Sequence, residues 1–142
     1  MYDAVIIGGG TAGMTAGIYL AGRGKTAVVL ERSSYGGQII NALNVENYPG
    51  IKSISGFDFA TQMYEQLLAG GGSLEFGDVK EIRVNKNSKT VVTEDAEYEC
   101  ERVIIASGAS NRKLGIEGEE ALVGRGISYC ATCDGGFFKG KI

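Results

Sequence analysis

The sequence contains no histidine, only one proline and only three cysteines in 142 residues. Without histidine, Ser–His–Asp triads and histidine-ligated metal sites are excluded. Three cysteines are too few, and odd in number, for the disulfide framework of a small secreted protein. A single proline and the lack of a G-X-Y period also exclude a collagen-like chain or a linker.

Long apolar runs and runs of one charge are missing too. The apolar runs, such as 27–30 and 103–106, are far shorter than the roughly 20 residues that cross a membrane. The 14 basic and 17 acidic side chains are interspersed, so there is no basic stripe for nucleic acid. The N-terminal residues do not read as a signal peptide. We therefore expect a cytoplasmic protein that binds neither membranes nor nucleic acid.

Glycine is present in excess. It occupies 23 of 142 positions, against about 7% in average chains. Such glycines are expected where the backbone turns tightly or approaches a ligand closely. The length predicts about one domain.

The hydrophobic pattern predicts alternating strands and helices. Buried strands at 2–7 and 26–30 flank a helix at 11–21, which makes a β-α-β unit with parallel strands. Further elements are expected as a short helix at 37–41 within the loop 33–49, a helix at 56–69 capped by Ser55, and strands at 74–76, 79–84, 90–93, 97–100 and 103–106. The fold class is therefore α/β, a Rossmann-like domain with a parallel sheet and a small antiparallel β-meander.

The strongest motif, G-G-G-T-A-G at 8–13, lies between the first strand and its helix. Gly8 permits the tight turn, Gly10 lets the backbone approach a pyrophosphate, and Gly13 lets the helix pack close to the strand. The helix N-terminus offers free N–H groups and a partial positive charge to the phosphates. Glu31 lies 18 residues (31 − 13) after Gly13, where a carboxylate can bind a ribose diol.

Several readings of this region stay open. The motif does not separate FAD from NAD, and a tight turn without a ligand also explains it. Arg32, beside Glu31, leaves room for a 2′-phosphate. The segments 35–38 and 107–108 can place backbone near a ligand, or can be ordinary turns.

A second motif is the pair Cys130 and Cys133, three positions apart. This spacing suits a redox disulfide or half of a zinc site, but zinc needs about four ligands and only Cys100 remains. Ser128 can cap a helix that begins near Cys130, which stabilises a thiolate there. Asp134 is the neighbouring group that can move protons if its carboxyl is buried. Two structural thiols and a turn aspartate are the alternatives.

Together these segments resemble the low-molecular-weight thioredoxin reductases. The resemblance covers the whole chain and rests on 8–13, Glu31, 36–39, 45–50, 106–109 and 130–135. It implies a homodimeric flavoenzyme with an FAD domain and an inserted NADPH domain. Electrons would pass from NADPH through FAD to a disulfide, and on to thioredoxin or a similar small dithiol protein.

The resemblance also implies a role for individual residues. Cys130 and Cys133 would be the redox pair, with Asp134 as the acid–base group and no metal. Thr11 stands where the family often has proline, and Ser107 where it usually has threonine. The residues expected along FAD are Gly8, Gly10, Thr11, Ala12, Gly13, Glu31, Arg32, Gly36, Gly37, Gln38, Asn47, Val79, Ala106, Ser107 and Gly108.

Two domains follow from the same resemblance. Residues 1–113 are expected to be the N-terminal part of the FAD-binding domain. Residues 114–142 are expected to be a hinge and the truncated beginning of the pyridine-nucleotide domain, which carries the CxxC motif. The NADPH motif of the family begins shortly after Ile142, so we expect an incomplete chain. The alternatives are a peroxide-reductase component, a ferredoxin-fed reductase, or a non-catalytic FAD-binding fragment.

Overall fold

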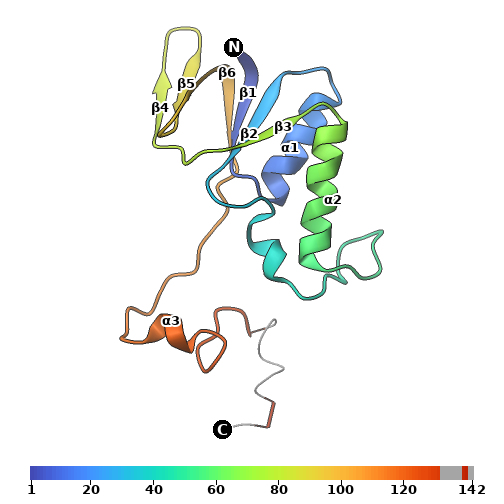
Figure 1. The fold of residues 1–142 in the computed structure, drawn as a ribbon, viewed down its shortest axis with the longest axis vertical. Helices are drawn as coiled ribbons and strands as arrows, with labels where there is room; N and C mark the ends of the chain where they lie inside the picture. Colours follow the sequence, from blue (N-terminus) through green and yellow to red (C-terminus); the bar gives the residue numbers. More distant parts are fainter. Residues whose placement is uncertain (132–138, 141–142) are drawn as a thin grey trace. The chain divides into compact units, whose positions relative to one another are not determined.

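The computed structural model describes residues 1–131 and 139–140, which fall into two compact units (Figure 1). The first unit is Met1–Gly108 and the second is Ala109–Ile142. The assignment of 1–113 and 114–142 to two cofactor domains stays a prediction.

The first unit is built on one six-stranded sheet with the order β3-β2-β1-β6-β5-β4. The neighbours β3, β2, β1 and β6 pair in parallel, whereas β6, β5 and β4 pair antiparallel. This confirms the α/β class with a parallel sheet and an antiparallel meander, and the two parts share one sheet. The strands are β1 Tyr2–Ile7, β2 Ala27–Glu31, β3 Ser73–Phe76, β4 Glu81–Val84, β5 Lys89–Val92 and β6 Glu97–Ile105.

Two α-helices lie side by side along the sheet (Figure 1). They are α1 Thr11–Ala21 and α2 Gly56–Ala69. The 3₁₀-helix η1, Gly37–Asn41, lies beside α2. The Ser55 hydroxyl accepts a hydrogen bond from the Asp58 N–H at 3.0 Å, which is the cap that the sequence predicts. Each of these helices is confirmed at its expected position.

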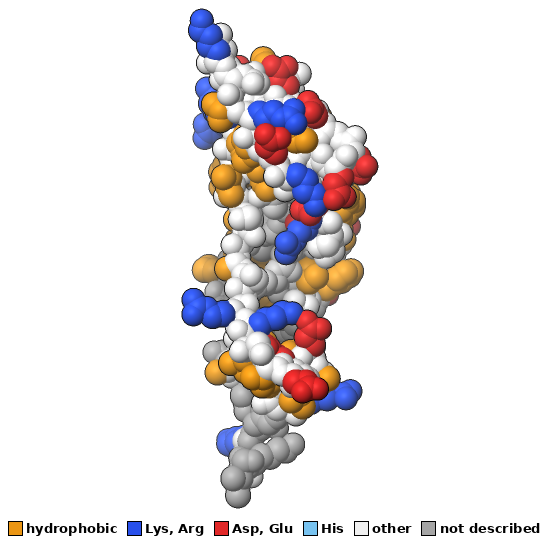
Figure 2. All heavy atoms as spheres, turned by 90° about the vertical axis from the view of Figure 1, so that its left-hand side faces the viewer, with side chains coloured by type: hydrophobic (Ala, Val, Ile, Leu, Met, Phe, Trp, Pro, Cys, Tyr) orange, Lys and Arg blue, Asp and Glu red, His pale blue; other side chains and the backbone are white. Residues whose placement is uncertain are grey.

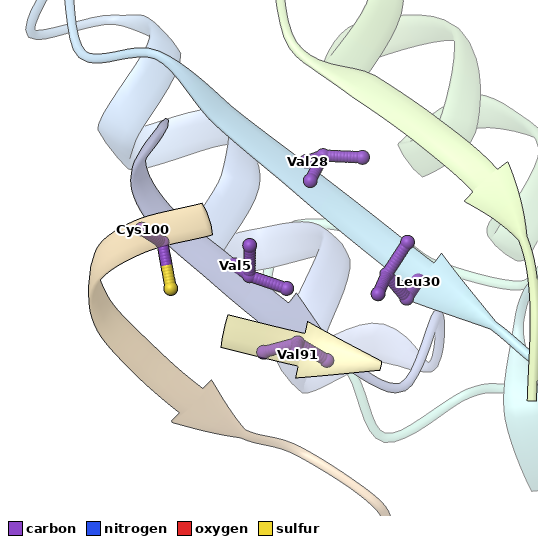
Figure 3. Close-up of a cluster of buried hydrophobic side chains, with 5 residues drawn as sticks. All are labelled: Val5, Val28, Leu30, Val91 and Cys100. Atoms are coloured by element: carbon purple, nitrogen blue, oxygen red, sulfur yellow. The ribbon is translucent and has the colours of Figure 1, made fainter. Parts of the chain in front are cut away.

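The sheet buries a core on each face, because successive side chains of a strand point to opposite sides. On the helix face, Ile6 and Val29 pack with Met14 of α1 and Leu67 of α2. The opposite face is covered by the meander. The meander-side core, between the meander and this face, consists of Val5, Val28, Leu30, Val91 and Cys100, which Figure 3 shows together.

The prediction of separate strands at 97–100 and 103–106 is wrong, because β6 runs unbroken from Glu97 to Ile105. Cys100 pairs with Lys89 of β5 and with Tyr2 of β1, so the strand changes its main partner there. The polar pair Glu101 and Arg102 interrupts the apolar pattern but leaves the strand intact, since both side chains are exposed.

The expected strand at 79–84 begins later than predicted. In the structure β4 starts at Glu81, and Val79 instead packs, half-buried, against the meander-side core. The outer face of the hairpin β4–β5 carries basic and acidic side chains close together (Figure 2). Arg83 pairs with Glu81 at 3.0 Å and with Glu97 at 2.8 Å. Such exposed pairs add little stability.

A hydrogen bond ties the meander to the far edge of the parallel sheet. The Tyr98 hydroxyl donates to Glu75 Oε2 at 2.8 Å, and the Tyr98 ring lies 6.3 Å from that of Tyr2. Burial, and then the Glu75 carboxylate, raise the pKa of Tyr98 to about 12. Folding therefore favours the protonated phenol, and this stabilisation is complete below pH 10 and lost as the pH rises through about 12.

We expect Tyr98→Phe to lower the free energy of unfolding by about 1 kcal/mol at neutral pH. The difference from wild type should shrink above pH 10 and change sign before pH 12, because the phenol ionises near pH 10 in the unfolded wild-type chain but stays protonated to about pH 12 in the folded protein. Urea unfolding of both proteins across this range measures it. An equal difference at pH 8 and pH 12 would show that folding does not raise the pKa of Tyr98.

The second unit contains the short helix α3, Glu119–Leu122. The buried Glu119 carboxylate accepts hydrogen bonds from the N–H groups of Leu114 and Gly115, at 2.9 and 2.7 Å. This carboxylate organises the backbone that precedes the helix. Within residues 1–131 and 139–140, no helix has the length and apolar character needed to span a membrane.

Candidate functional site

A tight glycine turn joins β1 to α1. Gly8 has φ +107°, and a Cβ on it would lie 2.3 Å from the Ala106 carbonyl oxygen. A Cβ on Gly13 would lie 1.9 Å from the Gly8 carbonyl oxygen. Since real Cβ atoms do not approach so closely, only glycine lets α1, the turn and the end of β6 pack together here.

Gly10 differs from these glycines because space lies beside it. A Cβ on Gly10 would meet nothing nearer than the Gly37 Cα at 3.9 Å. Gly10 is also the N-cap of α1, where no side chain accepts a hydrogen bond and no acidic residue lies in the first turn. The helix N-terminus is therefore free to bind an anion that approaches over Gly10.

The Glu31 carboxylate is fixed beside this turn, at the carboxyl end of β2. Glu31 is 8% exposed. Its Oε2 accepts a hydrogen bond from the Gly9 N–H at 2.7 Å, and its Oε1 accepts one from the Ser33 N–H at 3.0 Å. The Ser33 hydroxyl also donates to Oε1, at 3.4 Å. Two carboxylate oxygens offer about four acceptor positions, so a further hydroxyl donor can bind.

A cavity of about 240 Å³ opens at the carboxyl ends of the parallel strands, the edge where α/β sheets bind their ligands. Its lining residues are Ile7, Gly8, Leu30, Glu31, Arg32, Gly77, Asp78, Val79 and Ser107. Gly77 and Asp78 are not among the residues that the sequence predicts for the site. Their signal is their position directly after β3, a strand of the same parallel sheet.

The charges at this cavity are mixed. Lys80 forms a hydrogen-bonded ion pair with Asp78 at 2.8 Å and, with a smaller effect from Arg32, lowers the pKa of that carboxyl. Asp78 is therefore an anion at neutral pH. Arg32 lines the same cavity, so a cationic side chain lies there together with the carboxylates of Glu31 and Asp78.

A second glycine turn lies next to the first. The Gly36 N–H donates to the Gly9 carbonyl oxygen at 2.8 Å, and Gly10 and Gly36 form a parallel β-bridge. Gly36 and Gly37 have φ +101° and +62°, a region that favours glycine. Gly37 thereby comes to lie beside the open space at Gly10.

The structure brings together most of the predicted FAD-contacting residues. Around the cavity lie Gly8, Glu31, Arg32, Val79 and Ser107. Around the start of α1 lie Gly10, Thr11, Ala12, Gly13, Gly36 and Gly37, and Ala106 closes on Gly8. Gln38, Asn47 and Gly108 are exposed and outside the cavity. Their contact with a ligand stays a prediction.

The redox motif belongs to the second unit. Cys130 is disulfide-bonded, and its N–H donates to the Ser128 hydroxyl at 3.1 Å. Cys133 and Asp134 lie outside the described residues. Cys100 is a free thiol in the first unit, fully buried, and burial raises its pKa. Over the described ranges, no group of three histidine, cysteine or acidic side chains is placed to hold a metal.

Known proteins are similar to nearly the whole chain. The family described as pyridine nucleotide-disulphide oxidoreductase matches residues 2–141. A thioredoxin reductase of Bacillus subtilis (strain 168) is 46% identical over 99% of this chain and 45% of its own length. One of Treponema pallidum (strain Nichols) is 40% identical over 99% of the chain and 46% of its own length. The chain thus spans about half the length of these relatives.

Solved structures agree with the sequence relatives. The crystal structure of Lactococcus lactis thioredoxin reductase matches with a TM-score of 0.82 and 46% identity, over 97% of this chain and 46% of its own. That of the Streptococcus pyogenes MGAS5005 enzyme matches with a TM-score of 0.84 and 48% identity, over 97% and 45%.

Proposed function

The chain belongs to the pyridine nucleotide-disulphide oxidoreductase family, and on that premise we propose that it acts in a thioredoxin reductase that contains FAD. In this proposal electrons pass from NADPH through FAD to the disulfide of Cys130 and Cys133, and on to thioredoxin or a similar dithiol protein. The chain spans 45% of the Bacillus subtilis relative, so the activity is proposed for the whole cytoplasmic protein, acting as a homodimer.

The open space at Gly10 is the observation that carries this proposal. A Cβ there would make only ordinary van der Waals contacts, at 3.9 Å or more, so the Gly10 backbone leaves room for the close approach of a diphosphate. The uncapped start of α1 supplies N–H groups and a partial positive charge to that diphosphate. Thr11, Ala12 and Gly13 form the first turn of this helix.

The neighbouring residues fit the remaining parts of FAD. Glu31 is held in place by two backbone N–H groups and keeps acceptor positions for the adenosine ribose. Val79 and Arg32 line the same cavity and would lie beside the adenine. Gly36, Gly37, Gln38 and Asn47 would follow the ribityl chain and the flavin, with 106–108 on the other side.

When bound, the flavin supplies a carrier for two electrons between NADPH and the disulfide. The electron pair breaks the Sγ–Sγ bond of Cys130 and Cys133 and leaves a thiol and a thiolate, with Asp134 supplying the proton of the thiol. The thiolate attacks the partner's disulfide, forms a mixed disulfide and expels the partner's second sulfur, which takes up a proton. The remaining cysteine resolves the mixed disulfide, which restores the Cys130–Cys133 bond and releases the reduced dithiol.

Three alternatives are less well supported. They are a peroxide-reductase component, a ferredoxin-fed reductase and a non-catalytic FAD-binding fragment. The relatives that are 46% identical to the chain carry the name thioredoxin reductase, which favours the first proposal over all three.

The test is to purify the protein that the gene encodes and to measure its flavin and its electron donor. We expect a yellow protein whose bound FAD bleaches under NADPH and reoxidises when oxidised thioredoxin is added. A flavin that bleaches with reduced ferredoxin but not with NADPH would favour the ferredoxin-fed alternative. A colourless protein that takes up no FAD would contradict the proposal.

A further inference from the structure

The segment before the second glycine turn is attached to α2 by a stack of two tyrosine rings. The rings of Tyr35 and Tyr64 lie with centroids 4.5 Å apart and planes 7° from parallel. Both side chains are half-buried against the helix-face core. The stack therefore joins a loop residue to a residue inside a regular helix.

The turn itself rests on the same face of α2. A Cβ on Gly36 would lie 2.7 Å from the Ala60 Cβ, so the Gly36 backbone packs directly against the helix. Ala60 and Tyr64 are four residues apart and lie on one face of α2. This face thus offers a small side chain to the Gly36 backbone and a ring to Tyr35.

On its other side, Gly36 is bonded to the first glycine turn. Its N–H donates to the Gly9 carbonyl oxygen at 2.8 Å, and it forms a β-bridge with Gly10. A continuous series of contacts therefore runs from Tyr64 through Tyr35 and Gly36 to the open space at Gly10.

We propose that Tyr35 and Tyr64 are positioning residues, whose ring stack sets the place of the Gly36–Gly37 turn against bound FAD. This inference rests on the proposed function, because it needs FAD at the first glycine turn. Without the stack, the turn would keep its hydrogen bond to Gly9 and the contact of Gly36 with Ala60, but would lose the support that the Tyr35 ring gives it on α2. The turn would then have to be ordered when the cofactor binds, which weakens binding.

Leucine at either position tests this, since it keeps an apolar side chain and removes the ring. In the protein that the gene encodes, we expect Tyr35→Leu or Tyr64→Leu to raise the Kd of the apoprotein for FAD about three- to tenfold, the range of an aromatic pair. The double variant should be little worse than either single variant, since both remove one interaction. Tyr35→Phe and Tyr64→Phe keep the stack and should stay within about twofold of wild type.

The matched control is Tyr2→Leu. This substitution also removes one ring of an aromatic pair, Tyr2 and Tyr98, whose centroids lie 6.3 Å apart. Tyr2, however, packs in the core on the opposite face of the sheet. We expect this variant to unfold more easily while its Kd for FAD is unchanged. The flavin midpoint potential is a further readout. It should shift in the Tyr35 and Tyr64 leucine variants and stay constant in Tyr2→Leu.

The outcomes distinguish failure of this inference from failure of the proposed function. If wild type binds FAD and the leucine variants bind it equally well, this inference is overturned and the proposed function stands. Leucine effects that merely follow the loss of stability seen in Tyr2→Leu, or that add independently, also overturn it. If Tyr64→Leu fails to fold, Tyr35→Leu decides, since Tyr35 lies in a loop. A wild-type protein that binds no FAD overturns both proposals.

Discussion

Gly13→Ala is expected to destabilise the first unit severely, whereas Gly10→Ala leaves it folded and weakens only FAD binding. A Cβ on Gly13 would lie 1.9 Å from the Gly8 carbonyl oxygen and 3.3 Å from Ile6 Cγ2. Both neighbours are firmly placed, so α1 must move away from β1. We expect a loss of about 3 kcal/mol or more in the free energy of unfolding.

Gly10→Ala is the matched variant, because its Cβ would meet only the Gly37 Cα at 3.9 Å and the Gly36 carbonyl oxygen at 4.0 Å. The apoprotein should unfold within about 0.5 kcal/mol of wild type. The methyl group would nevertheless occupy the space proposed for the diphosphate, and the Kd for FAD should rise about tenfold or more.

Urea unfolding of both apoproteins, followed by titration with FAD, measures the two effects separately. Wild-type stability in Gly13→Ala would disprove the close packing of α1 on the turn. Unchanged FAD affinity in Gly10→Ala would show that the diphosphate does not lie there.

Cys130→Ser is expected to abolish the reduction of thioredoxin by NADPH, by a factor of about 1,000 or more. Serine cannot form the disulfide that accepts the electron pair from the flavin. Bleaching of FAD by NADPH should persist, because it precedes the disulfide step. Steady-state thioredoxin reduction and anaerobic flavin absorbance measure the two steps.

Cys100→Ser is the control for this variant. Cys100 is a free thiol that is fully buried in the meander-side core, and burial raises its pKa. A buried thiol with a raised pKa is a poor nucleophile. Its loss should cost stability and leave turnover almost unchanged. Thioredoxin reduction that survives Cys130→Ser but is lost in Cys100→Ser would require a different assignment of the redox pair.

Some features of the fold could be predicted because their causes lie within a few residues. The β-α-β unit and its glycine turn follow from a short apolar run, a glycine cluster and a helical repeat. The helix α2 follows from its Ser55 cap and its apolar face. Glu31 could be placed near the turn because β1 and β2 are parallel, and the carboxyl ends of neighbouring parallel strands lie at the same edge of the sheet.

Other features depended on residues far apart in the chain. β6 looked like two strands because Glu101 and Arg102 interrupt its pattern, yet pairing with β1 keeps it continuous. Asp78 joins the cavity only because β3 lies beside β2. The contact of Tyr35 with Tyr64 joins a loop to a helix residue 29 positions (64 − 35) later in the chain. No local sequence pattern predicts it.

The sequence by itself therefore determined the family resemblance, the glycine turn and the order of most elements, and it predicted the pairing of Cys130 with Cys133. These depend on residue types at short spacings, which act through local backbone preferences and local chemistry. Only the tertiary structure decided how β6 changes partner, which side chains line the cavity and what supports the second glycine turn. Those features arise from long-range packing, where each residue is placed by neighbours that its own segment does not specify.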